Sequence, residues 1–169
     1  MRYREYQLPD TAGLNARLYR RFLALSGTGQ ASRTHHFGGR FENIYIAMAD
    51  IPEIGTVLDA FRQQAGAWLG RDPHRLKAGF WFNAMEYGQR TSLHHHDEND
   101  ELLSAAYYVR VPAQSGDLVL YDGERTVPVH PQEGKLVMFA PALLHEVTAS
   151  HSHELRLSVG MNLGPAVPE

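Results

Sequence analysis

Apolar residues recur at helical spacing in two segments of the first half of the chain. In the first segment, one face is formed by Leu14, Leu18 and Phe22. Asp10 or Thr11 can cap the start of this segment, and Gly27 is placed to end it. The pattern predicts an amphipathic helix that packs one face on a sheet.

The second segment shows the same spacing over a longer stretch. Its apolar face consists of Ile54, Val57, Leu58, Phe61, Ala65 and Trp68. Asp50 and Glu53 are spaced as a capping box, and Gly70 follows the last turn. A second amphipathic helix is predicted between these signals.

From residue 78 onwards the pattern changes to short strand-like runs separated by Gly, Pro and Asp. The runs cover residues 78–85, 102–111, 118–121, 126–130, 135–140 and 154–163, and an earlier run covers residues 41–48. Two helices followed by many short strands predict a mainly β fold, an antiparallel barrel or jelly roll buttressed by helices. We expect one domain over residues 1–169, with the helical buttress and first strands in 1–77 and the core jelly roll in 78–164.

The composition restricts the chemistry available to a site in such a fold. The 169 residues include ten histidines and no cysteine, which excludes disulfides, thiolate metal sites and cysteine nucleophiles. A metal would therefore be held by histidine and carboxylate. The formal charge of -3 predicts no nucleic-acid partner. The charged start and the lack of a long apolar run predict a soluble cytoplasmic protein that is not bound to a membrane.

The segment from Leu93 to Asp100 reads Leu-His-His-His-Asp-Glu-Asn-Asp and lies where a strand ends and a loop begins. Side chains two residues apart on a strand share a face, so two of them can bind one metal. Three registers are open: His94 with His96, His95 with Asp97, and His96 with Glu98. Further along, the run from Gly134 to His145 reads as a strand whose end presents a single histidine. Two imidazoles and one carboxylate leave open positions for a cosubstrate and O2, as Fe(II) oxygenases require.

Arg156 stands in the alternating run from Glu154 to Leu163. Alternation places Arg156 and Ser158 on the face opposite Leu155 and Leu157. A guanidinium that points into a barrel needs an anionic partner, and its planar fork suits a carboxylate with a hydroxyl alongside. A dicarboxylic keto acid fits, because one end can chelate a metal while the other meets Arg156. A surface arginine, or an internal pair with Asp or Glu, is the alternative.

Further motifs accompany these residues in a characteristic order. They are Trp81-Phe-Asn83, Tyr87-Gly88, His94 to Asp97, Leu103 to Val109, Ser115-Gly116-Asp-Leu, Gly134 to His145 and Arg156 to Asn162. Together they resemble the Fe(II)/2-oxoglutarate-dependent dioxygenase superfamily, and within it the small bacterial oxygenases related to prolyl hydroxylases. The resemblance covers residues 78–164 and implies a double-stranded β-helix that uses Fe(II), 2-oxoglutarate and O2.

The resemblance also implies roles for individual residues. Carried over to this chain, the metal ligands are His95, Asp97 and His145, and the cosubstrate contacts are Arg156 and Ser158, with Tyr108 and Asn83 as further candidates for the same pocket. Alignment from Trp81 instead places a His-x-His pair on His94 and His96. We favour His95 and Asp97 because a carboxylate lowers the net charge of the site and suits Fe(II), and a three-histidine site is the alternative.

The predicted function is a non-haem Fe(II)- and 2-oxoglutarate-dependent dioxygenase that hydroxylates a small-molecule or peptide substrate and releases succinate and CO2. Metal and cosubstrate carry that chemistry, so we expect no protein residue to act as a general base. Two alternatives remain open: a cupin-type metal enzyme with ligands His94, His96, Glu101 and His145, and a non-catalytic jelly-roll binding module. The glycine-containing segment 34–40 is a candidate lid or an ordinary loop.

Overall fold

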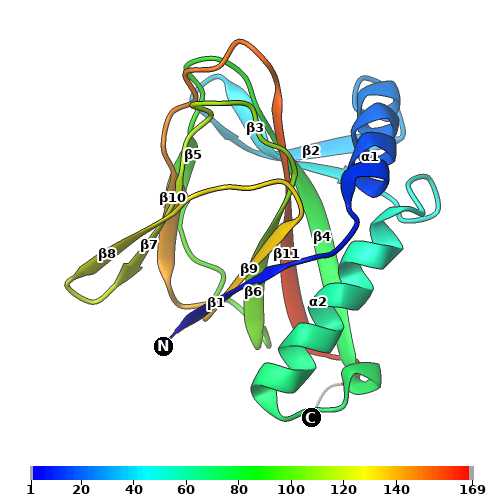
Figure 1. Cartoon of the computed structure of the whole chain (residues 1–169), viewed down its shortest axis with the longest axis vertical. Coiled ribbons are helices and arrows are strands. Elements are labelled where there is room, and N and C mark those ends of the chain that lie inside the picture. The colour runs from blue at the N-terminus through cyan, green and yellow to red at the C-terminus, as the bar shows by residue number, and fades with distance from the viewer. Residues whose placement is uncertain (1, 168–169) are drawn as a thin grey trace.

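The computed structural model describes residues 2–167, which form two antiparallel β-sheets and two α-helices (Figure 1). The predicted domain, 1–169, extends past these by residue 1 and residues 168–169. In chain order the elements are β1 (Tyr3–Gln7), α1 (Ala12–Leu25), β2 (Ala31–Phe37), β3 (Arg40–Ile46), α2 (Ile54–Leu69), the 3-10 turn η1 (Pro73–Arg75), β4 (Leu76–Met85), β5 (Thr91–His94), β6 (Leu103–Arg110), β7 (Leu118–Asp122), β8 (Arg125–Val129), β9 (Lys135–Phe139), β10 (Leu144–Val147) and β11 (Arg156–Pro165).

The strands divide into a major and a minor sheet. The seven-stranded major sheet has the order β1-β9-β6-β11-β4-β3-β2, and the four-stranded minor sheet has the order β5-β10-β7-β8. In Figure 1 the minor sheet lies on one side of the major sheet, and α1 and α2 lie on the other. The predicted mainly β jelly roll with a helical buttress is confirmed.

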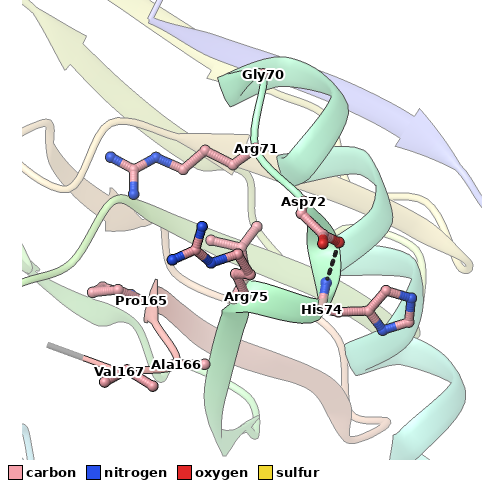
Figure 2. Close-up of a pocket in the computed structure, with 9 residues that line it drawn as sticks. Gly70, Arg71, Asp72, His74, Arg75, Pro165, Ala166 and Val167 are labelled. Atoms are coloured by element: carbon pink, nitrogen blue, oxygen red, sulfur yellow. Dashed lines mark hydrogen bonds between the residues drawn. The ribbon is translucent and has the colours of Figure 1, made fainter. Parts of the chain in front are cut away.

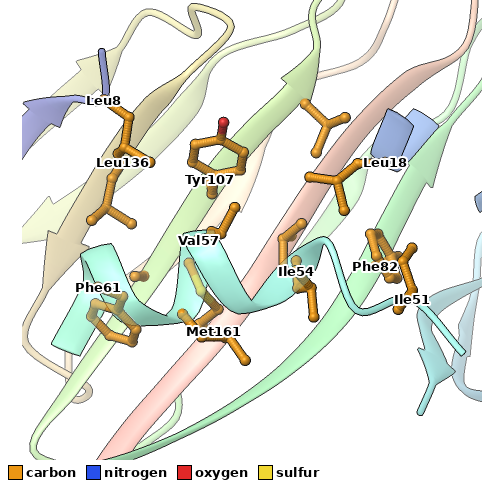
Figure 3. Close-up of a cluster of buried hydrophobic side chains, with 14 of the residues drawn as sticks. Leu8, Leu18, Ile51, Ile54, Val57, Phe61, Phe82, Tyr107, Leu136 and Met161 are labelled. Carbon is orange, nitrogen blue, oxygen red and sulfur yellow. The ribbon is translucent and has the colours of Figure 1, made fainter. Parts of the chain in front are cut away.

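The main hydrophobic core lies between the helices and the major sheet. The helices contribute the positions that the apolar spacing predicted, including Leu18 and Phe22 of α1 and Val57 and Phe61 of α2. The sheet contributes alternate residues of its strands, which for β11 are Leu157, Val159, Met161 and Leu163. Figure 3 shows side chains of α2 over those of the sheet, among them Tyr107 and Met161. The opposite face of β11 is thereby turned toward the minor sheet.

Both helices begin and end near the predicted signals, but neither N-cap residue, Thr11 of α1 or Glu53 of α2, makes a side-chain hydrogen bond to its helix. Gly70 ends α2 in the left-handed conformation, with a φ of 66°, as a C-terminal glycine allows. The predicted capping box of α2 is wrong, since Glu53 is itself the N-cap residue and makes no side-chain bond to the helix. Its carboxylate instead accepts a hydrogen bond of 2.6 Å from Arg21 of α1, because a charged donor binds it more strongly than a backbone amide does.

The run from Gly134 to His145 is two strands, where the sequence predicted one. The chain leaves the major sheet after Phe139 and enters the minor sheet at Leu144. Pro141 lies in the break, where a residue without an N–H cannot continue the hydrogen-bonded ladder. His145 therefore lies near the start of β10, in the second sheet.

The segment 34–40, considered above as a lid or a loop, is the end of a β-hairpin. Gly38 and Gly39 have φ values of 59° and 79° and form the two-residue turn between β2 and β3. Such turns need positive φ at both positions, which glycine adopts without strain. No helix within residues 2–167 has the length and apolar character needed to cross a membrane.

Candidate metal centre

Three histidines meet between the two sheets. His94, the last residue of β5, lies directly opposite His145 in the antiparallel pair of β5 and β10, and His96 follows in the turn after β5. Their ligand nitrogens all lie within 4.8 Å of one another. In the described part of the chain this is the one group of three or more potential ligands that could hold a metal ion.

Hydrogen bonds orient two of these rings. The Nδ1 atom of His94 lies 2.6 Å from the carbonyl oxygen of Ser92, and Nδ1 of His145 lies 2.9 Å from that of Leu143. A carbonyl oxygen only accepts, so each Nδ1 carries the hydrogen and donates it. The Nε2 atoms of both rings are then left with free lone pairs, which is the tautomer that metal-ligating histidines use when Nδ1–H is held by a carbonyl.

Burial keeps two of the three imidazoles uncharged. Removal from water lowers the pKa of His145 to about 3 and that of His96 to about 4, and the adjacent His94 contributes to both shifts. The two imidazoles are therefore neutral near pH 7, as a metal ligand must be. The cluster contains no carboxylate, so a metal held there would be bound by imidazole nitrogens alone.

The favoured register, His95 with Asp97, is not the one that the fold brings to His145. Both side chains are exposed, and Nδ1 of His95 accepts a hydrogen bond of 3.3 Å from the main-chain N–H of Asp97. The exposed Glu98 of the third register is likewise outside the cluster. Side chains alternate along a strand, so pairing of His94 with His145 turns His95 to the opposite face. The structure thus assembles the alternative register, His94 with His96.

Arg156 is buried at the start of β11, with 1% of its surface exposed. Its Nη1 donates to the carbonyl oxygens of Ser115 and Gly116, at 2.9 and 2.7 Å. Its Nε is buried and has no hydrogen-bond partner among residues 2–167. Burial lowers the pKa of Arg156, and the neighbouring Tyr108 and Asp117 oppose that shift. A carboxylate bound at Nε would relieve the cost of burying this cation.

The other three predicted pocket residues lie in one row beside Arg156. Ser158 pairs with Asn83 of β4 on one side and with Tyr108 of β6 on the other. The Tyr108 ring lies 5.5 Å from Cζ of Arg156, and burial raises the pKa of Tyr108 to about 12. The Tyr108 hydroxyl and Oδ1 of Asn83 are buried without a partner in the part of the chain described. Unmet polar atoms of this kind indicate a polar ligand or ordered water.

A small apolar cluster connects Arg156 to the histidines. It includes Tyr108, Val137 and Phe139 of the major sheet and Leu118 and Leu120 of the minor sheet. The Phe139 ring lies 4.7 Å from the ring of His145, while Tyr108 contacts Arg156. The cation and the three histidines therefore border the same space between the two sheets.

Several residues of the site were assigned no individual role from the sequence. Ser115 and Gly116 hold Arg156 through their carbonyls, and the Trp81 ring lies 5.3 Å from that of His96. Ser115-Gly116 and Trp81 both belong to motifs that carry the family resemblance, and this was the sequence signal that could have identified them as site residues. Gly116 has a φ of 96°, and a Cβ there would lie 2.2 Å from the carbonyl oxygen of Thr148. Only glycine fits where the chain passes so close to Arg156.

A separate cavity of about 410 Å³ lies at the C-terminal end of α2 (Figure 2). Its lining includes Gly70, His74, Arg75 and Pro165. It shares no residue with the histidine cluster or the Arg156 pocket, so it is not part of this site.

Comparison with known proteins supports the same chemistry. A family model described as the 2OG-Fe(II) oxygenase superfamily matches residues 80–164. Among solved structures, a prolyl-4-hydroxylase from Pseudomonas putida shares 19% identity over 96% of this chain and 92% of its own, with a TM-score of 0.73. A prolyl hydroxylase from Trichoplax adhaerens, solved with a hypoxia inducible factor peptide fragment, shares 14% identity over 96% of this chain and 83% of its own, also with a TM-score of 0.73.

A third solved structure is the non-heme alpha ketoglutarate dependent epimerase SnoN from nogalamycin biosynthesis. It shares 18% identity over 97% of this chain and 78% of its own, with a TM-score of 0.75. At these identities the likeness to solved structures establishes the fold. No curated protein sequence is a significant match. The cupin alternative included the same three histidines as metal ligands. The family match nevertheless favours the oxygenase class over the cupin class.

Proposed function

Because the chain belongs to the 2OG-Fe(II) oxygenase superfamily, we propose that it is a non-haem dioxygenase that binds Fe(II) and 2-oxoglutarate and hydroxylates a small-molecule or peptide substrate. One observation carries the proposal: a three-histidine cluster and a buried arginine with an unmatched Nε border one apolar cluster between the sheets.

The metal ligands in this proposal are His94, His96 and His145. The Nδ1 bonds to Ser92 and Leu143 hold two of the rings with Nε2 free, and burial keeps the imidazoles of His96 and His145 unprotonated. Imidazole is a suitable ligand for iron, and three ligands leave coordination positions open. We therefore propose this register in place of His95 and Asp97.

Arg156 is the proposed anchor for the distal carboxylate of 2-oxoglutarate. Nη1 is engaged by two carbonyls, which orients the guanidinium and leaves Nε to donate to the cosubstrate. The Tyr108 hydroxyl stays protonated at all physiological pH values and can donate to the same carboxylate. Asn83 and Ser158 complete the polar row in which the cosubstrate would lie.

These positions indicate which part of the reaction the bound groups would carry out and which roles the protein residues would have. When bound, Fe(II) and 2-oxoglutarate supply the oxidising chemistry, with O2 reduced and 2-oxoglutarate converted to succinate and CO2. The protein residues bind and orient: the histidines hold the metal, and Arg156 sets the position of the keto acid. The apolar cluster around Phe139 excludes water from the site. Trp81 packs beside His96, at the border of the histidine cluster.

The proposal is tested by anaerobic addition of Fe(II) and then 2-oxoglutarate. The complex should develop a weak visible charge-transfer band, and admission of O2 should release succinate. Arg156→Ala should weaken 2-oxoglutarate binding by about 10- to 150-fold, the equivalent of losing charged hydrogen bonds, while Arg110→Ala, which removes an exposed arginine paired with Glu154, should not change it. A wild-type protein that shows neither the band nor succinate release contradicts the proposal.

A further inference from the structure

β5 carries His94 but has little support from its own sheet. It is four residues long and lies at the edge of the minor sheet, with β10 as its one neighbour. Its pairing with β10 is limited to His94 with His145 and Thr91 with Val147, with a register shift between them. Edge strands this short are held weakly by ladder hydrogen bonds, so other contacts must hold His94 in place.

Those contacts come from β3, a strand of the major sheet. Glu42 is 5% exposed, and its carboxylate binds Ser92 twice: Oε1 accepts from the main-chain N–H at 2.7 Å, and Oε2 accepts from the hydroxyl at 2.8 Å. The carboxylate thus supplies the acceptor that a neighbouring strand would otherwise provide. Carboxylates engaged in two such bonds form strong, directional contacts.

Arg40, two residues earlier on β3, holds the residues just before Ser92. Its Nη2 donates to the Arg90 carbonyl oxygen at 3.0 Å and to Oγ1 of Thr91 at 2.9 Å, and its Nη1 donates to the Ala84 carbonyl oxygen at 3.1 Å. Arg40 and Glu42 together form hydrogen bonds with three consecutive residues, 90–92. The β2–β3 hairpin is therefore joined to β5 by side chains, although its strands belong to the other sheet.

The chain of contacts continues from Ser92 to the candidate ligand. The carbonyl oxygen of Ser92 accepts the Nδ1 hydrogen of His94 at 2.6 Å. Glu42 fixes the position of Ser92, and Ser92 fixes the tautomer and orientation of the His94 ring. Outer contacts of this kind control how well a ligand presents its lone pair to a metal.

We propose that Glu42 is a positioning residue of the metal centre, acting on His94 through Ser92. The proposal rests on His94 being a metal ligand, as argued above. It places the buried carboxylate of Glu42 outside the group of candidate ligands, where it orders His94. It also makes the β2–β3 hairpin a structural support of the metal centre.

The test measures Co(II) affinity and the visible Co(II) absorption spectrum, neither of which depends on turnover. Glu42→Ala should lower Co(II) affinity by about 10- to 100-fold, the range seen when outer contacts of ligands are removed, and should alter the spectrum. Glu42→Gln can still accept from the Ser92 N–H and pair with its hydroxyl, so it should restore affinity to within about threefold of wild type. The matched control is Tyr107→Phe, which removes a buried hydrogen bond to Asn15 away from the metal.

The outcomes separate the two proposals. If wild-type protein binds no Co(II), the metal centre itself is refuted. If wild type binds Co(II) and Glu42→Ala binds it equally well, the role of Glu42 is refuted while the metal centre stands. If Tyr107→Phe lowers affinity as much as Glu42→Ala, the effect is general destabilisation and the positioning role is refuted. Should Glu42→Ala not fold, Glu42→Asp decides, because a carboxylate one methylene shorter cannot keep both bonds to Ser92 in place: a loss of about three- to tenfold supports the role, and unchanged affinity overturns it.

Discussion

His94 and His145 lie directly opposite each other in the pair of β5 and β10, with ring centroids 4.2 Å apart. Residues so placed in an antiparallel pair have side chains on the same face of the sheet. The pairing therefore selects which of the three consecutive histidines can share a metal with His145. His96, two residues on, keeps that face, and His95 does not.

The ligand register can be tested directly with single substitutions. Replacing His94, His96 or His145 by alanine should reduce Fe(II) or Co(II) affinity by more than about 100-fold, because each removes a direct ligand. His95→Ala and Asp97→Ala are matched controls from the same turn and should stay within about twofold of wild type. Calorimetric titration of the metal measures all five. A collapse of affinity in Asp97→Ala would instead support the His95–Asp97 register.

Trp81 should report metal binding by fluorescence. The chain has two tryptophans, and Trp68 lies on α2, on the helical side of the major sheet, under Arg4. Since the Trp81 ring lies 5.3 Å from that of His96, a bound transition metal should quench it strongly. In a Trp68→Phe variant, Co(II) is expected to quench most of the emission, and His145→Ala should abolish the effect. Equally strong quenching in a Trp81→Phe variant, which keeps only Trp68, would place the metal elsewhere.

Gly160 should be intolerant of even one added methyl group. A Cβ at this position would lie 2.3 Å from Cε2 of Trp81. Gly160→Ala should therefore lower the free energy of unfolding by about 1–3 kcal/mol, as overpacking does, and shift the Trp81 emission. Gly79→Ala on the neighbouring strand meets nothing within 4 Å and should change stability by no more than about 0.5 kcal/mol. Denaturant unfolding of the two variants compares them, and equal stabilities would contradict the close contact.

Tyr107 and Tyr108 should resist ionisation at high pH. Burial raises the pKa of both to about 12, above the ordinary value of 10. The folded state therefore holds these protons more tightly than the unfolded state, so their contribution to stability is complete below about pH 10 and is lost as the pH rises toward 12. Near pH 11, roughly two of the eight tyrosines should appear as tyrosinate only after denaturant is added. Tyr107→Phe should lower this number from two to one. If denaturant adds no tyrosinate signal in the wild-type protein, the burial of the two residues is contradicted.

Much of the fold could be predicted because burial imposes a period on the sequence. The apolar spacing of Leu14, Leu18 and Phe22, and of Ile54 to Trp68, identified both helices and the faces that they bury. The alternating pattern predicted that Arg156 and Leu157 lie on opposite faces of their strand, and in the structure they do. The run from Gly134 to His145 was harder, since an apolar run does not show where a chain changes sheets.

The sequence by itself determined the helices, the β-rich core, the supply of histidines and the buried arginine, because each depends on local periodicity or residue type. Only the tertiary structure selected His94 and His96 over His95 and Asp97, and only it brought Glu42 to Ser92. Strand alternation says that every second side chain shares a face, but it does not say which face points to the core. Three consecutive histidines therefore fit either assignment until pairing with a neighbouring strand fixes it. β5 pairs with β10, and Glu42 of β3 binds Ser92 of β5. Both contacts join residues that are far apart in the chain, so a local sequence pattern cannot predict them.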